Sequence, residues 1–169
     1  AEVGVVDAAE PGTGLGPIQN RVQFERVKDL IADAHRTGVR FLTGGEVPEG
    51  KGYFVPVTIL DNPPDDARSV VEEAFGPVLP LLKYRDIDEV IRRANDTEYG
   101  LGGSVWSRDV ALAQSVARRL ETGTVWINHI HVMSPNVPFG GHKQSGVGVE
   151  NALDGLLEYT NVQTVSVPV

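Results

Sequence analysis

The sequence predicts an α/β fold in which a mostly parallel sheet is flanked by helices. Two observations support this prediction. Stretches with apolar residues three and four positions apart alternate with short β-branched stretches, and Gly or Pro marks the turns between them. Strands that are separated by amphipathic helices pair in parallel through right-handed crossovers. With 169 residues, of which 41% are hydrophobic and 22% charged, the chain is long enough to bury a core.

The first half of the chain is predicted to hold one long helix and three strands. The helix is expected over residues 20–37, because apolar residues recur there at helical spacing and Gly38 supplies an end. Pro56 lacks an N–H group, so we expect its strand to be an edge strand or irregular. The apolar stripe of the helix consists of Val27, Leu30, Ile31 and Ala34. The strands are expected at residues 39–43, 53–60 and 79–84.

The second half is predicted to alternate strands and helices. Asp86 and Glu89 have the spacing of a capping box, which predicts the start of a helix. Ser107 or Asp109 is expected to cap the next helix, which ends at Leu120. The apolar stripes expected to face inward are Ile87, Val90, Ile91 and Ala94 in the first helix and Ala113, Val116, Ala117 and Leu120 in the second. The helix that starts at Asp86 is expected to end at Asn95. The other expected elements are strands at 103–106, 124–128 and 161–167, a Gly- and Pro-rich loop to Gly148, and a helix over 150–159.

Composition excludes several classes of function. The net charge of −8 and the pI of about 4.9 argue against nucleic acid, because a phosphate-binding surface needs basic residues. The chain has no Cys, which rules out disulfides, thiolate zinc sites and a cysteine nucleophile among these residues. No stretch approaches the roughly 18 apolar residues of a membrane span, and residues 1–6 do not have the pattern of a signal peptide. We therefore expect a cytoplasmic protein that binds neither nucleic acid nor membranes.

Several local patterns suggest chemistry but lack the required context. The glycines of residues 12–16 follow no strong strand and do not have the dinucleotide-binding spacing. Residues 140–146 lack the order of a nucleotide P-loop, and Ser145 sits in no nucleophile elbow. The histidines have no carboxylate cluster to complete a metal site, so we interpret them as loop or pocket-lining residues and predict no metal. These histidines are His129, His131 and His142.

A set of short motifs runs in order along nearly the whole chain. The sharpest of them is VEEAFGPV at residues 71–78. The others are GLGP at 14–17, ANDTEYGL at 94–101, GTVWIN at 123–128, PFGGHKQSG at 138–146 and EYT at 158–160. Each motif alone is weak, whereas the collinear set is specific. Taken together, the motifs resemble the C-terminal part of the catalytic domain of the aldehyde dehydrogenase family.

The resemblance implies an NAD- or NADP-dependent oxidation of an aldehyde to a carboxylic acid. In this family a cysteine attacks the carbonyl, hydride passes to the nicotinamide, and a glutamate activates water. By resemblance, Glu73 would accept hydrogen bonds from the nicotinamide ribose hydroxyls, and Phe75 would pack beside the nicotinamide ring. Gln23 and Arg26, the latter at a position where the family often has Lys, would contact the same ribose.

The resemblance also implies contacts to the aldehyde substrate. Asn128 precedes the loop that shapes the substrate tunnel in the family. Met133 and Phe139 match positions that line this tunnel, where a large apolar side chain limits substrate width. His131 is expected at a somewhat polar tunnel mouth.

The chain departs from the family pattern in its catalytic residues. The nucleophilic cysteine and the general-base glutamate of the family lie before the first motif found here, so we predict that the 169 residues alone are inactive. Val149 stands where the family often carries Arg, which puts in doubt an ion pair at that loop.

The resemblance further implies association with other polypeptide. Residues 1–160 would form part of a catalytic domain, and residues 161–169 would form a strand that extends a sheet into a partner subunit. An open strand edge and an uncovered apolar face should then promote self-association into a homo-oligomer, or association with the rest of the enzyme. Two other interpretations stay open: a stand-alone non-catalytic assembly module derived from the family, and an unrelated α/β hydrolase or binding domain.

Overall fold

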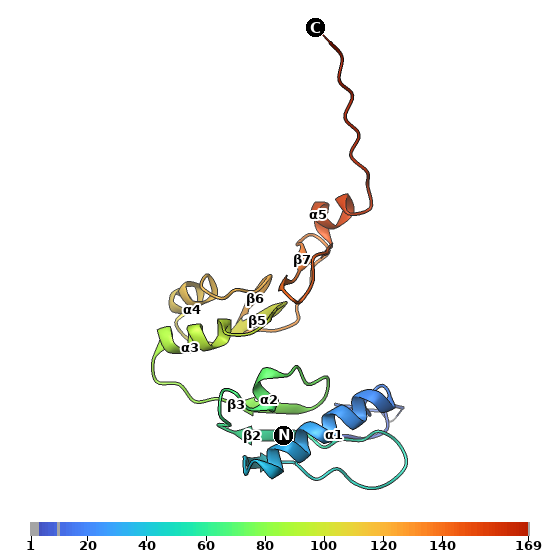
Figure 1. Cartoon of the computed structure of the whole chain (residues 1–169), viewed down its shortest axis with the longest axis vertical. Helices are drawn as coiled ribbons and strands as arrows, with labels where there is room; N and C mark the ends of the chain where they lie inside the picture. The colour runs from blue at the N-terminus through green and yellow to red at the C-terminus, as the bar shows by residue number, and fades with distance from the viewer. Residues whose placement is uncertain (1–3, 10, 169) are drawn as a thin grey trace. The chain divides into compact units, whose positions relative to one another are not determined.

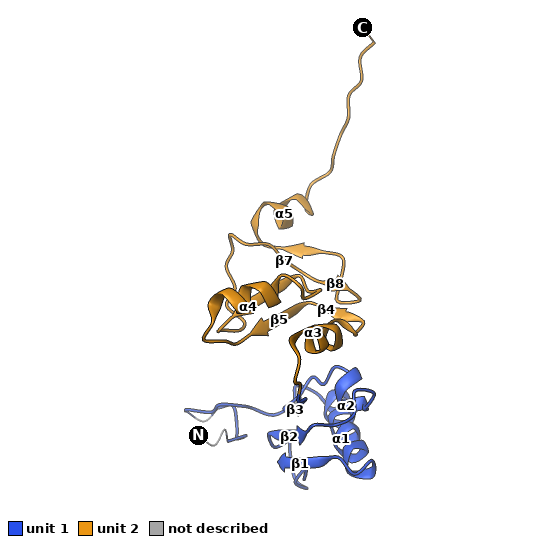
Figure 2. Cartoon of the chain, turned by 90° about the vertical axis from the view of Figure 1, so that its left-hand side faces the viewer, with its two compact units in different colours: residues 1–83 blue, residues 84–169 orange. Residues whose placement is uncertain are grey.

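The computed structural model describes residues 4–9 and 11–168 and confirms the α/β class. It divides into two compact units, residues 1–83 and residues 84–169, which are coloured separately in Figure 2. Two compact units can belong to one folding domain. The prediction of one domain over 1–160 and a terminal strand over 161–169 therefore stays a prediction.

The first unit packs one long helix against a three-stranded sheet (Figure 1). The helix is α1 (Arg21–Arg36), and the sheet has the order β1 (Arg40–Thr43), β2 (Thr58–Asp61), β3 (Val78–Leu81). β1 pairs with β2 antiparallel, whereas β2 and β3 are parallel. A short helix, α2 (Arg68–Val71), lies on the connection between the two parallel strands. The predicted strands at 39–43 and 79–84 thus exist, each a little shorter than expected.

Helix α1 forms where the apolar spacing predicts it. The side chain of Asn20 accepts a hydrogen bond of 2.9 Å from the backbone N–H of Gln23, which caps the first turn. Gly38 follows the helix with φ +73°, a conformation that favours glycine. All members of the predicted stripe are buried, with exposed fractions of 1–3%: Val27, Leu30, Ile31 and Ala34. Three of them, Val27, Ile31 and Ala34, pack in one cluster with buried residues of the sheet.

The second strand corrects the prediction made from Pro56. The expected strand over residues 53–60 forms only at β2, and β2 is the central strand of its sheet and not an edge. Pro56 lies before the paired residues, so its missing N–H is not needed in the ladder. Its carbonyl accepts a hydrogen bond of 3.0 Å from the Thr58 hydroxyl, and both Thr58 and Leu60 are fully buried.

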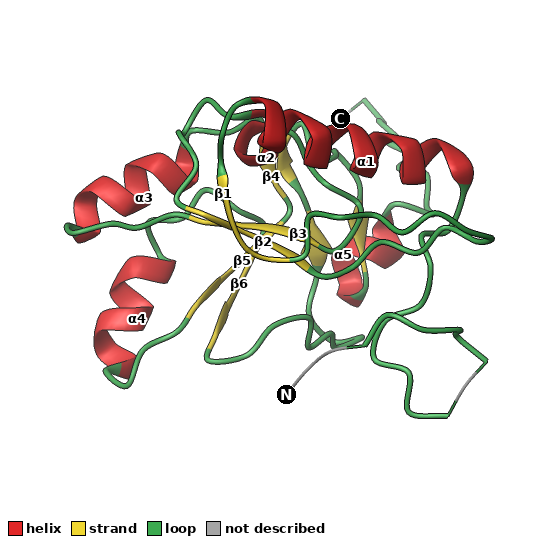
Figure 3. Ribbon diagram, turned by 90° about the horizontal axis from the view of Figure 1, so that it is seen from below, coloured by secondary structure: helices red, strands yellow, loops and turns green. Residues whose placement is uncertain are grey.

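The second unit is built on a parallel pair of strands. β5 (Gly102–Val105) and β6 (Thr124–Ile127) pair in parallel, and α4 (Val110–Ala117) connects them, as the alternation of strand and helix predicts. α3 (Ile87–Asn95) precedes this pair, and β4 (Tyr99–Gly100) follows α3. Figure 3 shows these helices and strands in red and yellow.

Carboxylate caps start both of these helices. The Asp86 side chain accepts from the Glu89 N–H at 2.8 Å, which confirms half of the predicted capping box. Of the two candidates for the next helix, Asp109 is the cap, because its side chain accepts from the Leu112 N–H at 2.9 Å. Ser107 instead accepts from the Asp109 N–H, so it supports the cap.

The loop predicted up to Gly148 contains two very short strands, β7 (Phe139–Gly140) and β8 (His142–Lys143), and a third, β9 (Val149–Glu150), follows it directly. β4 pairs with β8, and β7 pairs with β9, both antiparallel. Two-residue strands are too short to show a period of two in the sequence, which is why they were missed. The predicted helix over 150–159 forms as α5 (Ala152–Leu157).

The second unit has a thin apolar core. Among the described residues of this unit, the buried apolar ones are Ile91, Ala113 and Trp126. The expected inward stripes are therefore wrong in part: Ala94 is exposed, and Val116, Ala117 and Leu120 are only half-buried. Helix α5 likewise leaves three leucines more than half exposed: Leu153, Leu156 and Leu157. Helical spacing shows which face is apolar, whereas burial depends on what packs against that face.

The predicted strand over 161–167 has no strand partner among the described residues. Residues 160–168 follow α5 without helix or strand (Figure 1). Val162, Val165 and Val167 are 95%, 79% and 77% exposed. A strand requires hydrogen bonds from a neighbour, so these residues alone cannot form one. Within residues 4–9 and 11–168, no helix combines the length and apolar character needed to cross a bilayer.

Truncating the central strand's core side chain should destabilise the first unit. We expect Leu60→Ala to lower the free energy of unfolding by about 2–5 kcal/mol, because Leu60 is fully buried and the change leaves a cavity. Leu42→Ala on the neighbouring strand is the matched control, and it should cost less than about 0.5 kcal/mol because Leu42 is 48% exposed. Urea unfolding followed by circular dichroism measures both. Equal losses in the two variants would contradict the described core.

Candidate functional site

The segment of residues 72–76 connects α2 to β3 and carries two of the candidate cofactor residues. The Glu73 carboxylate is exposed, and the Phe75 side chain is 58% exposed. Gly76 lies directly against α1: a Cβ at this position would stand 2.7 Å from a methyl group of Val27 and 3.1 Å from Ile18. Only glycine allows this approach without a shift, so Gly76 anchors one end of the segment to α1.

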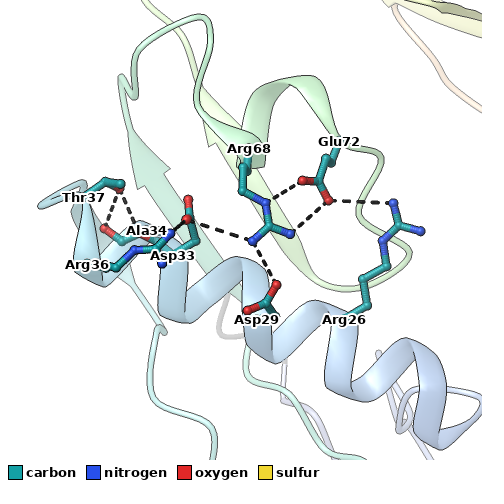
Figure 4. A network of polar contacts seen from close by, with 8 residues as sticks. All are labelled: Arg26, Asp29, Asp33, Ala34, Arg36, Thr37, Arg68 and Glu72. Carbon is teal, nitrogen blue, oxygen red and sulfur yellow. Dashed lines mark hydrogen bonds and ion pairs between the residues drawn. The ribbon is translucent and has the colours of Figure 1, made fainter.

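Arg68 anchors the other end through a network of ion pairs (Figure 4). Its guanidinium donates two hydrogen bonds to the Glu72 carboxylate, at 2.5 and 3.2 Å. The same group donates to Asp29 on α1 at 2.8 Å. Glu72 also lies 3.8 Å from the Arg26 guanidinium of α1. A planar guanidinium matches a carboxylate in this two-bond arrangement, which fixes direction as well as distance.

The network shifts the ionisation of its members. The two hydrogen bonds from Arg68 lower the pKa of Glu72, and the charge of Arg26 acts in the same direction. Partial burial and the Asp29 charge oppose this shift of the Glu72 pKa but are outweighed. Hydrogen bonds to Glu72 and Asp29 raise the pKa of Arg68 above its ordinary value. Farther along α1, Asp33 pairs with Arg36 and lies 4.0 Å from Arg68.

The structure places one of the predicted cofactor residues against the segment of residues 72–76. The Arg26 guanidinium lies 3.8 Å from the carboxylate of Glu72, the neighbour of Glu73. Gln23 is half-buried in the first turn of α1. Among the described residues, Glu73 makes no hydrogen bond or ion pair. Its two carboxylate oxygens are therefore available to accept hydrogen bonds from a ligand.

The predicted substrate residues lie in the second unit, on the loop after β6 and in β7. Asn128 ends the strand with φ +58°, and its side-chain amide forms two hydrogen bonds, at 2.8 and 2.9 Å, with the backbone of Ser107. The buried Trp126 ring donates from Nε1 to the Val132 carbonyl at 2.9 Å. These contacts fix both the start and the middle of the loop.

Trp126 also contacts a predicted site residue directly. The His131 ring meets the Trp126 ring edge-on, with 5.7 Å between the ring centroids. Met133 is 48% exposed, and Phe139 is half-buried in β7. The described part of the chain brings no three His, Asp or Glu side chains together in a metal-binding arrangement.

Sequence reasoning missed the residues that hold the segment of residues 72–76. Glu72 and Gly76 belong to the motif at residues 71–78, but neither was assigned a contact, and Arg68 was not considered. One signal was present: Arg68 and Glu72 are four residues apart, the spacing of a helical ion pair. The contacts to Asp29 and Val27 join residues far apart in sequence, and no local pattern indicates them.

Comparison with known proteins identifies the class of this chain. The fold is that of an oxidoreductase family. The model of the aldehyde dehydrogenase family matches residues 1–165, and the chain belongs to this family.

Relatives show how much of such a protein the chain represents. It is 42% identical to aldehyde dehydrogenase 1A1 of Gallus gallus over 163 residues, which are 96% of this chain and 32% of the relative. The NAD+ complex of aldehyde dehydrogenase from Bacillus cereus superposes with a TM-score of 0.91 at 40% identity, covering 96% of this chain and 33% of that chain. A mutant of aldehyde dehydrogenase C from Pseudomonas syringae, complexed with NAD+ and octanal, superposes with a TM-score of 0.87 at 39% identity. This match covers 93% of this chain and 33% of that chain. The chain thus spans about a third of the length of these relatives.

Removing the charge of Glu72 should make the stability of the chain less dependent on pH. Because the folded-state pKa of Glu72 lies below its ordinary value of 4.5, its ion pair stabilises the fold above that pH. This stabilisation disappears as the pH falls through the folded pKa. We expect Glu72→Gln to be less stable than the unsubstituted chain at pH 7, with the difference shrinking toward zero below about pH 4.

Thermal unfolding across this pH range measures the effect. Glu73→Gln is the matched control, because it removes the same charge from the adjacent residue, which has no partner among the described residues. The network would be contradicted if Glu72→Gln and Glu73→Gln had the same pH profile.

Proposed function

We propose that this chain is part of an NAD(P)-dependent aldehyde dehydrogenase and supplies contacts to the nicotinamide ribose and to the aldehyde. The observation that supports this most is the segment of residues 72–76, held at both ends against α1. Between its anchors it exposes a carboxylate and an aromatic ring. This combination suits a ligand that presents hydroxyl groups next to a flat ring.

The side chains of this segment and of α1 match the chemical groups of a nicotinamide riboside. A carboxylate with two free oxygens can accept from both hydroxyls of a ribose, and this is the role proposed for Glu73. Phe75 supplies a flat apolar surface on the same segment, and its exposure leaves the ring free to stack on a ligand. Gln23 adds an amide on α1, one turn from Arg26. When bound, the nicotinamide accepts a hydride, and these residues hold it in a fixed orientation.

The second unit is proposed to contact the aldehyde. His131, Met133 and Phe139 lie on a loop and strand that Trp126 and Asn128 fix to the parallel pair of strands. Met133 and Phe139 are apolar and His131 is polar, which fits a tunnel for an apolar chain with a polar mouth. The relative from Pseudomonas syringae was crystallised with octanal, an aldehyde with such a chain.

The nucleophile has to come from residues outside these 169. Thiohemiacetal chemistry needs a thiolate, and the sequence contains no cysteine. We therefore expect the isolated 169-residue polypeptide to form no NADH from aldehyde. We propose that activity belongs to a longer polypeptide, in which a cysteine and a general-base glutamate would complete the site.

Replacing the proposed ribose ligand should weaken cofactor binding selectively. In the complete gene product we expect Glu73→Gln to raise the KM for NAD+ or NADP+ by about 10–100-fold, the worth of a hydrogen bond to a charged group. The aldehyde KM should change much less. Glu46→Gln, a charge removed from an exposed position in the same unit, is the control and should leave both constants unchanged.

Steady-state kinetics with varied cofactor measures this difference. Equal effects of Glu73→Gln and Glu46→Gln would contradict the role of Glu73. A complete gene product that forms no NADH from any aldehyde would contradict the dehydrogenase proposal and favour the assembly module.

We also propose that residues 161–167 add a strand to a sheet of a partner subunit. The alternation of Val165 and Val167 with polar residues gives one apolar face, and both valines are exposed in the single chain. Such a segment gains backbone hydrogen bonds only by pairing with another chain.

Sedimentation of the chain should therefore show species heavier than the 18.2 kDa monomer. We expect Val165→Glu to shift the population toward monomer, because a charge on the apolar face opposes its burial. Val147→Glu is the control, since Val147 is fully exposed in a different loop. A monomer at every concentration would contradict the proposal.

A further inference from the structure

The ammonium group of Lys143 lies at the C-terminal end of α3. Nζ donates to the backbone carbonyl of Asn95 at 2.6 Å and to that of Thr97 at 3.2 Å. It also pairs with the Glu121 carboxylate at 2.8 Å. Three partners match the three N–H donors of a lysine. The carbonyls at a helix end are unpaired and carry partial negative charge, so a cation there is favourable.

The residues next to Lys143 are tied to the same region through their own polar groups. The Gln144 N–H donates to the Glu98 carbonyl, and the Ser145 hydroxyl accepts from the Gly100 N–H, both at 2.9 Å. Lys143 itself has φ +54°, a conformation that costs energy for any residue with a Cβ. Its side-chain contacts hold it in this conformation.

The other end of this turn is fixed by two glycines. The carbonyl of Gly140 sits so close to Gly123 that a Cβ on Gly123 would overlap it. The Gly123 N–H in turn donates to the Gly100 carbonyl at 3.0 Å. Gly140 follows Phe139 directly in β7, so Phe139 lies next to this contact at the start of the turn, four residues before Lys143.

We propose that Lys143 is a positioning residue that sets how far Phe139 reaches toward the aldehyde. The inference rests on the function proposed above, in which Phe139 lines the substrate tunnel. Lys143 acts through the turn of residues 139–145 and contacts neither the aldehyde nor the cofactor itself. Its loss should change which aldehydes fit, whereas the cofactor contacts, which belong to the first unit, should keep their geometry.

The test replaces Lys143 by Met in the complete gene product, which keeps the apolar stem and removes the ammonium group. We expect the ratio of kcat/KM for octanal to that for acetaldehyde to change by about tenfold, the effect of a small change in a pocket's width. The KM for the cofactor should stay within about twofold of its original value. Lys143→Arg, which keeps donors for the two carbonyls, should restore most of the original ratio. Lys51→Met, an exposed lysine of the first unit, is the control.

Amide hydrogen exchange over residues 139–146 gives a second readout that needs no activity. Lys143→Met should speed exchange in this turn, and Lys51→Met should not. Unchanged aldehyde preference in an active Lys143→Met enzyme would overturn the positioning role, even if exchange were faster. An unsubstituted gene product without dehydrogenase activity would instead contradict the proposed function itself.

Discussion

The placement of residues 72–76 in the first unit depends on the guanidinium of Arg68, which joins two segments that are far apart in the chain. Its bonds to Glu72 and Asp29 connect the start of the segment of residues 72–76 with the middle of α1. Gly76 makes a second connection by packing against Val27. A short segment held at both ends has little freedom, so the backbone at Glu73 between the anchors is held in place. Ion pairs near the surface add little stability, and here their main contribution is geometry.

The second unit positions its loop by backbone contact. The Gly123 and Gly140 backbones approach more closely than any side chain would allow, and β4 and β8 pair only two residues each. Such short elements have few hydrogen bonds of their own. They therefore need side chains such as Lys143 to close the turn. The first unit has a continuous apolar core to build on, whereas the second relies on polar contacts around three buried apolar residues.

Much of the fold could be predicted because it is encoded over short distances. The long helix, its cap at Asn20 and the caps at Asp86 and Asp109 follow from local spacing and composition. The order of strand and helix also predicted the parallel pair of β5 and β6, whereas the parallel pair of β2 and β3 was not predicted, because no helix was expected between them. The position of β2 at the centre of its sheet was not predicted, because a strand's place depends on which neighbours reach it. The exposure of Ala94 has the same origin, since an apolar face is buried only where something covers it.

The sequence by itself determined the family motifs, the candidate residues Glu73, Phe75 and Phe139, and the lack of a cysteine nucleophile. These are properties of residue identity and order along the chain. Only the tertiary structure decided that Arg68 links Glu72 to α1 and that Lys143 reaches the end of α3. Their partners lie up to 48 residues away, and nothing in a local pattern specifies which distant group a long cationic side chain will meet. That choice is made by the packing of the helices and strands, which brings the charges within reach.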